Sequence, residues 1–234
     1  MRLHRFYLEN ENFETLTKGD IFICRNEAVV GQISRVLRAQ AGDRVRFFNT
    51  SGECECVIDT IGKKDIFCRV TGYIEPLIQN KKVILVQSLI KKDKFEWAAQ
   101  KATELGVTDI YPVISERSEK RGLDENRLGK IMIEATEQSG WGSAPVLHPI
   151  NTLAETFVIL SKEKVVLYLL DMDGEKYVKN NSSVAVAIFI GPEGGWSEQD
   201  KALFKANSVQ TISLGRSVLR AETAAVVGVF TYTQ

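Results

Sequence analysis

The 234-residue sequence has few of the residues that carry metal or redox chemistry. It contains only two histidines, His4 and His148, and four cysteines, none of which forms a Cys-x-x-Cys pair. Metal ligands at the usual spacing are therefore absent, and no metal site is expected. Cys54 and Cys56 alternate with glutamates, which indicates small apolar side chains on one face of a strand rather than a redox pair.

Long apolar runs and excess charge are lacking as well. No run approaches the roughly 20 apolar residues of a membrane-spanning helix, and the first residues do not resemble a signal peptide, so we expect a cytoplasmic protein without a membrane partner. Lys plus Arg and Asp plus Glu number 30 each, and residues 1–74 hold 11 basic and 10 acidic residues, which leaves 19 and 20 for the rest. Bulk charge therefore does not indicate nucleic-acid binding, which would need a local basic patch.

The chain divides into two regions that differ in the periodicity of their apolar residues. Residues 1–74 predict a small β-rich domain, interpreted as a barrel, with a helix over 28–40 and strands near 5–8, 20–24, 44–48, 54–58 and after 65. Residues 75–234 alternate helices with continuous apolar strands, at 83–86, 109–114, 165–170, 184–190 and 209–214. This order predicts an α/β domain built on a mostly parallel, doubly wound sheet.

Three loops of the second region follow predicted strands, where open α/β sheets bind their ligands. They cover residues 169–174, 190–197 and 213–220. The second loop, Gly191-Pro192-Glu193-Gly194-Gly195, lets its backbone approach a flat ligand, although a purely structural turn explains it equally well. Neither a P-loop nor a Gly-x-Gly-x-x-Gly motif is present, which disfavours a nicotinamide-dependent oxidoreductase.

Five segments match, in order, the motifs of a known enzyme family. They are residues 100–107, 115–118, 134–140, 190–195, and the pair 214–215 with 219–224. Through them the chain resembles, over nearly its whole length, the RsmE family of 16S ribosomal RNA uridine-N3 methyltransferases, a branch of the SPOUT superfamily. The chain departs from the family at Trp141 and Ser217, where arginine is usual.

The resemblance implies a PUA-like RNA-binding β-barrel at residues 1–74 and a SPOUT methyltransferase domain with a deep trefoil knot at 75–234. It implies S-adenosylmethionine as the cofactor, a homodimer whose sites are completed by the partner, and N3 of one uridine in the 16S rRNA of the small ribosomal subunit as the target. Two alternatives stay open: a related methyltransferase acting on another RNA, favoured by the altered arginines, and a non-catalytic RNA-binding ribosome-assembly factor.

On this resemblance, specific residues are expected at the site. The cofactor residues would be Leu170, Gly191, Glu193, Gly195, Leu214, Gly215 and Leu219. Arg220 and Glu222 are the catalytic candidates, because a cation can stabilise charge on the uracil oxygens and a carboxylate can accept the N3 proton. A carboxylate near a helix start also interacts favourably with the helix dipole, so Glu222 need not be catalytic. The RNA-binding candidates are Arg2, Arg5, Arg117, Lys120 and Arg121.

Overall fold

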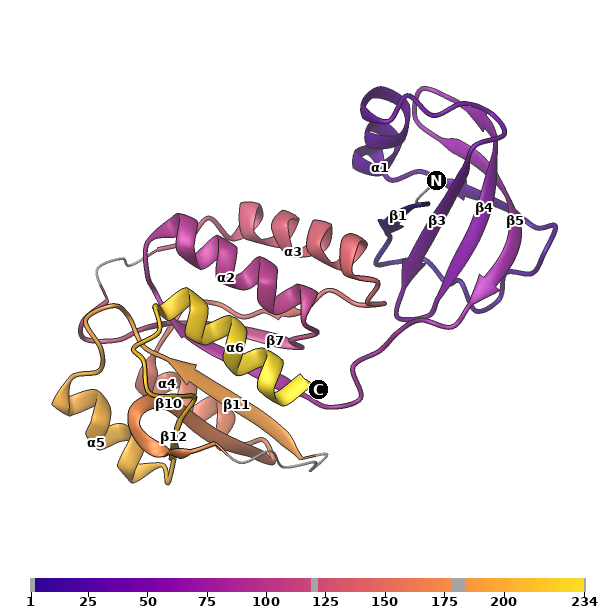
Figure 1. Cartoon of the computed structure of the whole chain (residues 1–234). Coiled ribbons are helices and arrows are strands. Elements are labelled where there is room, and N and C mark those ends of the chain that lie inside the picture. The colour runs from indigo at the N-terminus through magenta and orange to yellow at the C-terminus, as the bar shows by residue number, and fades with distance from the viewer. Residues whose placement is uncertain (1–2, 119–121, 178–183, 234) are drawn as a thin grey trace. The chain divides into compact units, whose positions relative to one another are not determined.

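The structure, a computed structural model, describes residues 3–118, 122–177 and 184–233, which form two compact units (Figure 1). The first unit holds the residues up to 78 together with residues 136–143, and the second holds residues 79–135 and those from 144 onward. The sequence pattern did not predict that residues 136–143, which follow the first part of the second unit, belong to the first unit. The division at residues 74 and 75 stays a prediction.

The first unit is a five-stranded sheet wrapped round a core rich in aromatic residues. Its strands are β1 (His4–Tyr7), β2 (Ile21–Cys24), β3 (Arg44–Asn49), β4 (Gly52–Ile61) and β5 (Ile66–Ile74), in the order β1-β3-β4-β5-β2. β1 runs parallel to β3, and the other pairs are antiparallel. All four cysteines are buried in this core and none forms a disulfide, as expected for small apolar side chains.

The helix predicted over residues 28–40 is shorter and less regular than expected. It consists of α1 (Glu27–Gly31), which Asn26 caps, followed by a π-helical turn, η1 (Gln32–Val36). The chain then leaves the helix at Arg38, whose φ of 52° lies in the left-handed region. Of the apolar residues at helical spacing, Val29 and Ile33 are buried but Val36 is 73% exposed, so the spacing predicted only part of the buried face. It also cannot show where the backbone turns out of the helix.

The second unit is an α/β domain with an entirely parallel sheet, as predicted. Its strands are β6 (Val83–Ser88), β7 (Asp109–Ile114), β8 (Val146–Leu147), β9 (Asn151–Thr152), β10 (Val165–Lys176), β11 (Ala185–Ile190) and β12 (Gln210–Ser213). The order is β12-β10-β11-β6-β7-β8, with β9 also pairing with β7. The helices are α2 (Lys92–Glu104), α3 (Glu125–Ser139), α4 (Leu153–Leu160), α5 (Glu198–Ala206) and α6 (Ala221–Thr233).

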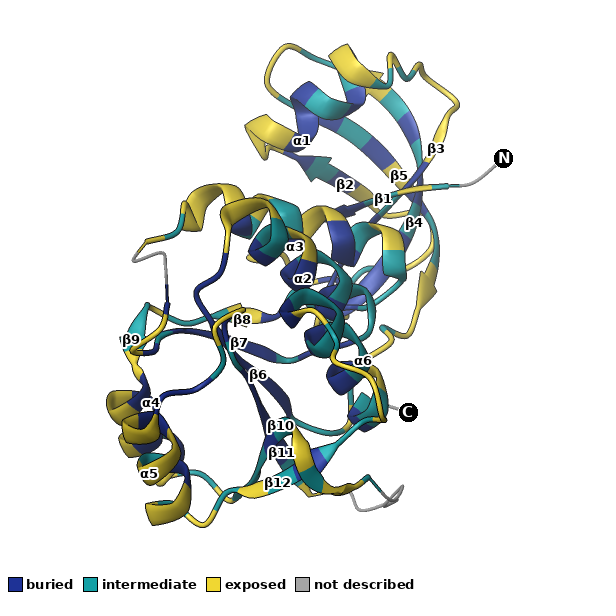
Figure 2. Cartoon of the chain, turned by 60° about the vertical axis from the view of Figure 1, so that its left-hand side comes forward, coloured by how far each residue is buried: buried dark blue, intermediate teal, exposed yellow. Residues whose placement is uncertain are grey.

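The sheet is covered on both faces, which explains its continuous apolar strands. Val83 and Leu85 of β6 point into a core shared with α2, α3 and α6, whereas Ile84 and Val86 point into a second core shared with α4 and α5. Figure 2 shows the central strands fully buried and exposed residues along α4 and α5. Within the described ranges, no helix is both long and apolar enough to cross a membrane.

Candidate functional site

The three segments singled out in the sequence meet at one cavity, which lies beside the middle of β10 and the carboxyl ends of β11 and β12. The cavity has a volume of about 390 Å³. All seven predicted cofactor residues line it: Leu170, Gly191, Glu193, Gly195, Leu214, Gly215 and Leu219. Arg220 lines it too, but Glu222 is not among the lining residues. The structure therefore brings together residues from segments that are up to 50 positions apart in the chain.

The glycine-rich loop after β11 is held in a tight turn. Gly195 donates its N–H to the carbonyl of Pro192 at 2.9 Å and has a φ of 68°, a conformation that favours glycine. A Cβ at Gly191 would lie 3.0 Å from Nε1 of Trp196, so this position has little space for a side chain. The loop ends in a capping box, in which Ser197 and the buried Asp200 exchange hydrogen bonds at the start of α5.

The first predicted loop, residues 169–174, is instead a bulge inside a longer strand. β10 continues to Lys176, and both Leu170 and Glu175 pair with Ile212 of β12. Gly174 permits this arrangement, because a Cβ there would lie 2.6 Å from the backbone of Ile212. The bulge places Asp171 and Met172 in the cavity wall. Both belong to the predicted loop 169–174 but were not among the expected cofactor residues.

α6 closes the floor of the cavity and packs closely against the sheet. A Cβ at Gly228 would lie 2.7 Å from Cδ1 of Leu170 and 3.3 Å from Cγ2 of Ile188. The glycine therefore lets the helix approach β10 and β11 at the point where Leu170 lines the cavity. Near the start of the same helix, Glu222 has a buried Oε2 that no side chain or backbone group of the described residues bonds.

Glu193, in the cavity wall, is paired with a lysine from α2. Nζ of Lys94 donates to Oε1 of Glu193 at 3.0 Å. Partial burial by itself would raise the pKa of Glu193, but the backbone N–H of the residue and the Lys94 ammonium outweigh it and hold the pKa below its usual range. The hydrogen bond to Glu193 in turn raises the pKa of Lys94. Both groups are therefore charged at neutral pH.

The cavity suits S-adenosylmethionine in size and in chemistry. Its volume lies in the range of about 300–1,000 Å³ that is usual for small-ligand sites. Leu170, Ile190 and Leu219 provide apolar surface for an adenine ring, and Asp171 and Glu193 provide negative charge suited to a cationic ligand. Nε1 of Trp196, a lining residue, is a buried donor without a partner among the described residues, as expected where a ligand supplies the acceptor.

Arg5, a predicted RNA-binding residue, is engaged inside the first unit. Its guanidinium donates to Glu53 at 2.7 and 3.0 Å and lies 3.8 Å from the ring centre of Phe48. It also donates to the carbonyls of residues 136, 137, 140 and 141, at the end of α3 and just after it. With 11% of its side chain exposed, Arg5 already has intramolecular partners for its donors.

Arg117, a second predicted RNA-binding residue, also has a partner in the protein. Its Nη1 donates to the carbonyl of Gly194 at 2.9 Å, so it lies against the glycine-rich loop. Arg2, Lys120 and Arg121 lie outside the described residues. The described part of the chain contains no group of three or more His, Cys, Asp or Glu residues able to hold a metal ion.

Comparison with known proteins assigns a family to both regions of the chain. A family model described as an RNA methyltransferase domain matches residues 78–231, and one described as an RNA methyltransferase PUA domain matches residues 33–71. Ribosomal RNA small subunit methyltransferase E of Rickettsia conorii is 30% identical over 98% of this chain and 94% of its own length.

Two solved structures are similar over almost the whole chain. Ribosomal RNA small subunit methyltransferase E from Neisseria gonorrhoeae, bound to S-adenosylmethionine, superposes with a TM-score of 0.85 at 27% identity and covers 97% of this chain and 95% of its own. A Legionella pneumophila methyltransferase with the same bound cofactor gives 0.84 at 29% identity, over 98% and 96%. The chain thus belongs to the RNA methyltransferase family that includes ribosomal RNA small subunit methyltransferase E, the family that its sequence motifs indicated.

Proposed function

We propose that the protein transfers the methyl group of S-adenosylmethionine to N3 of one uridine in the 16S rRNA of the small ribosomal subunit. The observation that carries this proposal is the single cavity in which all seven expected cofactor residues meet, in a chain of the RNA methyltransferase family. The relatives are named for methylation of small-subunit ribosomal RNA, and the choice of N3 of uridine rests on the motif resemblance.

The cofactor would be held by the two glycine-bearing loops and by Leu170 and Leu219. When bound, S-adenosylmethionine supplies a methyl group on a sulfonium, and the sulfur is released as a neutral thioether. The backbones of Gly191, Gly195 and Gly215 can approach the ligand closely, because no side chain intervenes. Holding donor and acceptor in line supplies much of the rate acceleration, roughly 7–11 kcal/mol in well-oriented systems.

Arg220 and Glu222 are the residues proposed to act on the uracil. The carboxylate of Glu222 would accept the N3 proton as N3 takes up the methyl group that the bound cofactor would supply. The exposed Arg220 lines the cavity, where its charge would stabilise the negative charge that develops on the uracil oxygens. Glu222 is the second residue of α6, which begins just after Arg220, and its buried Oε2 has no hydrogen-bond partner among the described residues. N3 lies on the pairing edge of the base, so the uridine must be unpaired or flipped out.

RNA binding is proposed for the PUA-like domain and for Arg2, Lys120 and Arg121. Because the chain carries no net charge, diffuse attraction to phosphate is weak. We therefore propose that the substrate is the assembled small subunit in the cytoplasm rather than free rRNA. Efficient methylation of protein-free RNA would contradict this preference.

We also propose that the protein acts as a homodimer and that the cofactor loops lie in a trefoil knot. α6 supports the first point, because its sequence, AETAAVVGVFTYT, is apolar on all sides while Phe230 is 52% exposed. A helix of this kind is normally covered, and a second copy of the chain would cover it. Sedimentation equilibrium tests this: a monomer at micromolar concentration would contradict the dimer.

The reaction is tested with purified protein, S-adenosylmethionine and small subunits from a strain that lacks the gene, followed by nucleoside mass spectrometry. N3-methyluridine in the product would support both reaction and target. Cofactor binding without methyluridine would refute the target and leave the methyltransferase assignment in place.

A second candidate is methylation of a different RNA by the same chemistry. The observation that favours it is that Ser217 and Trp141 stand at positions where the family usually has arginine. Ser217 lines the cavity and Trp141 lies in the first unit, so both replacements could change which RNA is bound. Nucleoside analysis of all RNA classes from a deletion strain separates the two candidates. Loss of a methylated nucleoside from tRNA or large-subunit RNA alone would favour the second.

A further inference from the structure

The glycine-rich loop is held from outside by two cations that reach it from different elements. Lys94 comes from the first turn of α2 and binds the Glu193 carboxylate at 3.0 Å. Arg117 follows β7 and binds the Gly194 carbonyl at 2.9 Å. The two anchored residues are consecutive and lie between Gly191 and Gly195, and Glu193 lines the cavity together with both of these glycines.

Neither cation is itself among the residues that line the cavity. Their contacts therefore act on the loop and not directly on a bound cofactor. A loop containing three glycines within five residues has a high conformational entropy when it is unconstrained. Two contacts at its centre limit the shapes that it can adopt before the cofactor arrives, which lowers the cost of binding.

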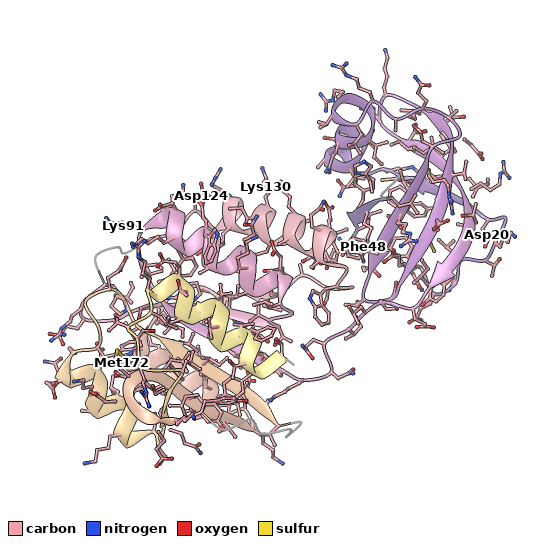
Figure 3. The ribbon with its side chains drawn as sticks, viewed as in Figure 1. Asp20, Phe48, Lys91, Asp124, Lys130 and Met172 are labelled. Carbon is pink, nitrogen blue, oxygen red and sulfur yellow. The ribbon has the colours of Figure 1, made fainter. Side chains whose placement is uncertain are left out.

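Resting on the proposed function, we propose that Lys94 and Arg117 are positioning residues that preform the cofactor-binding shape of the loop at residues 191–195. Arg117 then serves the cofactor site rather than the RNA, in contrast to its role expected from the sequence. Figure 3 labels Lys91, the residue before α2, and Met172 of the β10 bulge at this same end of the domain.

The test measures the affinity for S-adenosylmethionine by calorimetry for Lys94→Met, Arg117→Met and the double variant. We expect the Kd to rise about 2- to 5-fold for Lys94→Met, the range for a partly exposed ion pair, and about 2- to 10-fold for Arg117→Met. The double variant should lose at least as much as the worse single variant. Lys94→Arg, which keeps the cation, should stay close to the wild type.

Matched controls are available in the same unit. Lys101→Met removes another lysine of α2 that pairs with a glutamate, Glu104 at 2.7 Å, and Arg127→Met removes an exposed arginine that pairs with Glu96. Both should bind the cofactor as the wild type does. Thermal unfolding of all variants separates a weakened loop from general destabilisation, since the positioning role predicts weaker binding in variants with unchanged Tm.

Steady-state kinetics separate a positioning role from a general structural role, because only a positioning role should change the KM for the cofactor without changing kcat. The KM for S-adenosylmethionine should rise while kcat at saturating cofactor and the affinity for unmethylated small subunits stay within about 2-fold. Unchanged cofactor affinity in the double variant would overturn the inference. So would an Arg117→Met variant that loses only subunit affinity, because Arg117 would then be an RNA contact. A wild-type protein that binds no S-adenosylmethionine would instead overturn the proposed function itself.

Discussion

Substituting Gly228 in α6 should reveal how strictly the floor of the cofactor cavity is packed. In an open helix, Gly→Ala stabilises by up to about 1 kcal/mol, because alanine loses less backbone entropy on folding. At Gly228 the added Cβ would lie 2.7 Å from Cδ1 of Leu170 and 3.3 Å from Cγ2 of Ile188. Overpacking of a well-filled core typically costs about 1–3 kcal/mol. The sum predicts that Gly228→Ala destabilises the domain by about 0–2 kcal/mol.

Gly129 in α3 provides the matched control, since nothing lies within 4 Å of a Cβ built there. Gly129→Ala should therefore stabilise by about 0.5–1 kcal/mol. Both glycines belong to the second unit, so the same calorimetric transition reports on both. With about 2–4 °C of Tm per kcal/mol for a protein of this size, the control should unfold a few degrees above the wild type and Gly228→Ala at or below it.

The two variants should differ in function as well. Because Leu170 lines the cavity, any movement that makes room for the new methyl group changes the surface offered to the cofactor. Gly228→Ala should therefore bind S-adenosylmethionine more weakly, whereas Gly129→Ala should bind it normally. If Gly228→Ala stabilised the protein as much as the control and bound the cofactor equally well, the packing argument for the cavity floor would be refuted.

Three further predictions concern the core and the cavity wall. Arg5→Met leaves the buried carboxylate of Glu53 with only one of its two arginine partners. Breaking a buried ion pair typically costs about 3–5 kcal/mol, so the free energy of unfolding measured by chemical denaturation should fall by an amount near the lower end of that range. A fall below about 1 kcal/mol would count against a structural role for Arg5. Burial raises the pKa of the Cys54 and Cys68 thiols to about 11 and about 12. The folded state thus favours the protonated thiols. The free energy of unfolding should therefore not depend on these thiols below about pH 8, and it should decrease above about pH 9, where the thiols of the unfolded chain lose their protons. Urea titrations at several pH values measure this, and Cys→Ala variants should show a smaller decrease. Trp196→Phe removes the indole N–H, which has no hydrogen-bond partner among the described residues. Calorimetry should show weaker binding of S-adenosylmethionine, whereas the affinity for the small subunit should be unchanged. Equal cofactor affinity would show that the N–H does not contact the ligand.

The sheet could be predicted from the sequence because its signal is local. Each buried strand is a short apolar run, and runs separated by helices imply parallel pairing. The bulge in β10 could not be predicted in this way. It depends on the close approach of Gly174 to the backbone of Ile212, 38 residues away, and a single glycine after two aspartates is equally typical of a simple loop. Asp171 and Met172 were therefore expected in a simple loop rather than inside a strand.

The positions of the expected cofactor residues were easier to predict than the roles of the charged residues. Gly191, Gly195 and Gly215 lie in loops after predicted strands, where α/β sheets bind ligands. The family resemblance then singled them out as cofactor residues, and all three line one cavity. An arginine carries no such restriction. Arg5 is bound to Glu53 and to the end of α3, and no pattern around residue 5 indicates a partner more than 130 positions away.

The engagement of Arg5 and Arg117 changes where RNA contacts are to be sought. Two of the five cations expected to bind RNA already have partners in the protein, whereas Arg216 and Arg220, on the third loop, are exposed and have no ion-pair partner among the described residues. Ser217 stands where the family usually has arginine, and Arg216 is its immediate neighbour. A cation displaced by one position on an exposed loop can still reach a phosphate or a uracil oxygen, because arginine has a long and flexible side chain. If Arg216 supplies the contact that Ser217 lacks, Arg216→Met should weaken subunit binding and reduce its salt dependence by about one phosphate contact, with cofactor affinity unchanged. An unaltered salt dependence would mean that this enzyme recognises its RNA without a cation at that point of the loop.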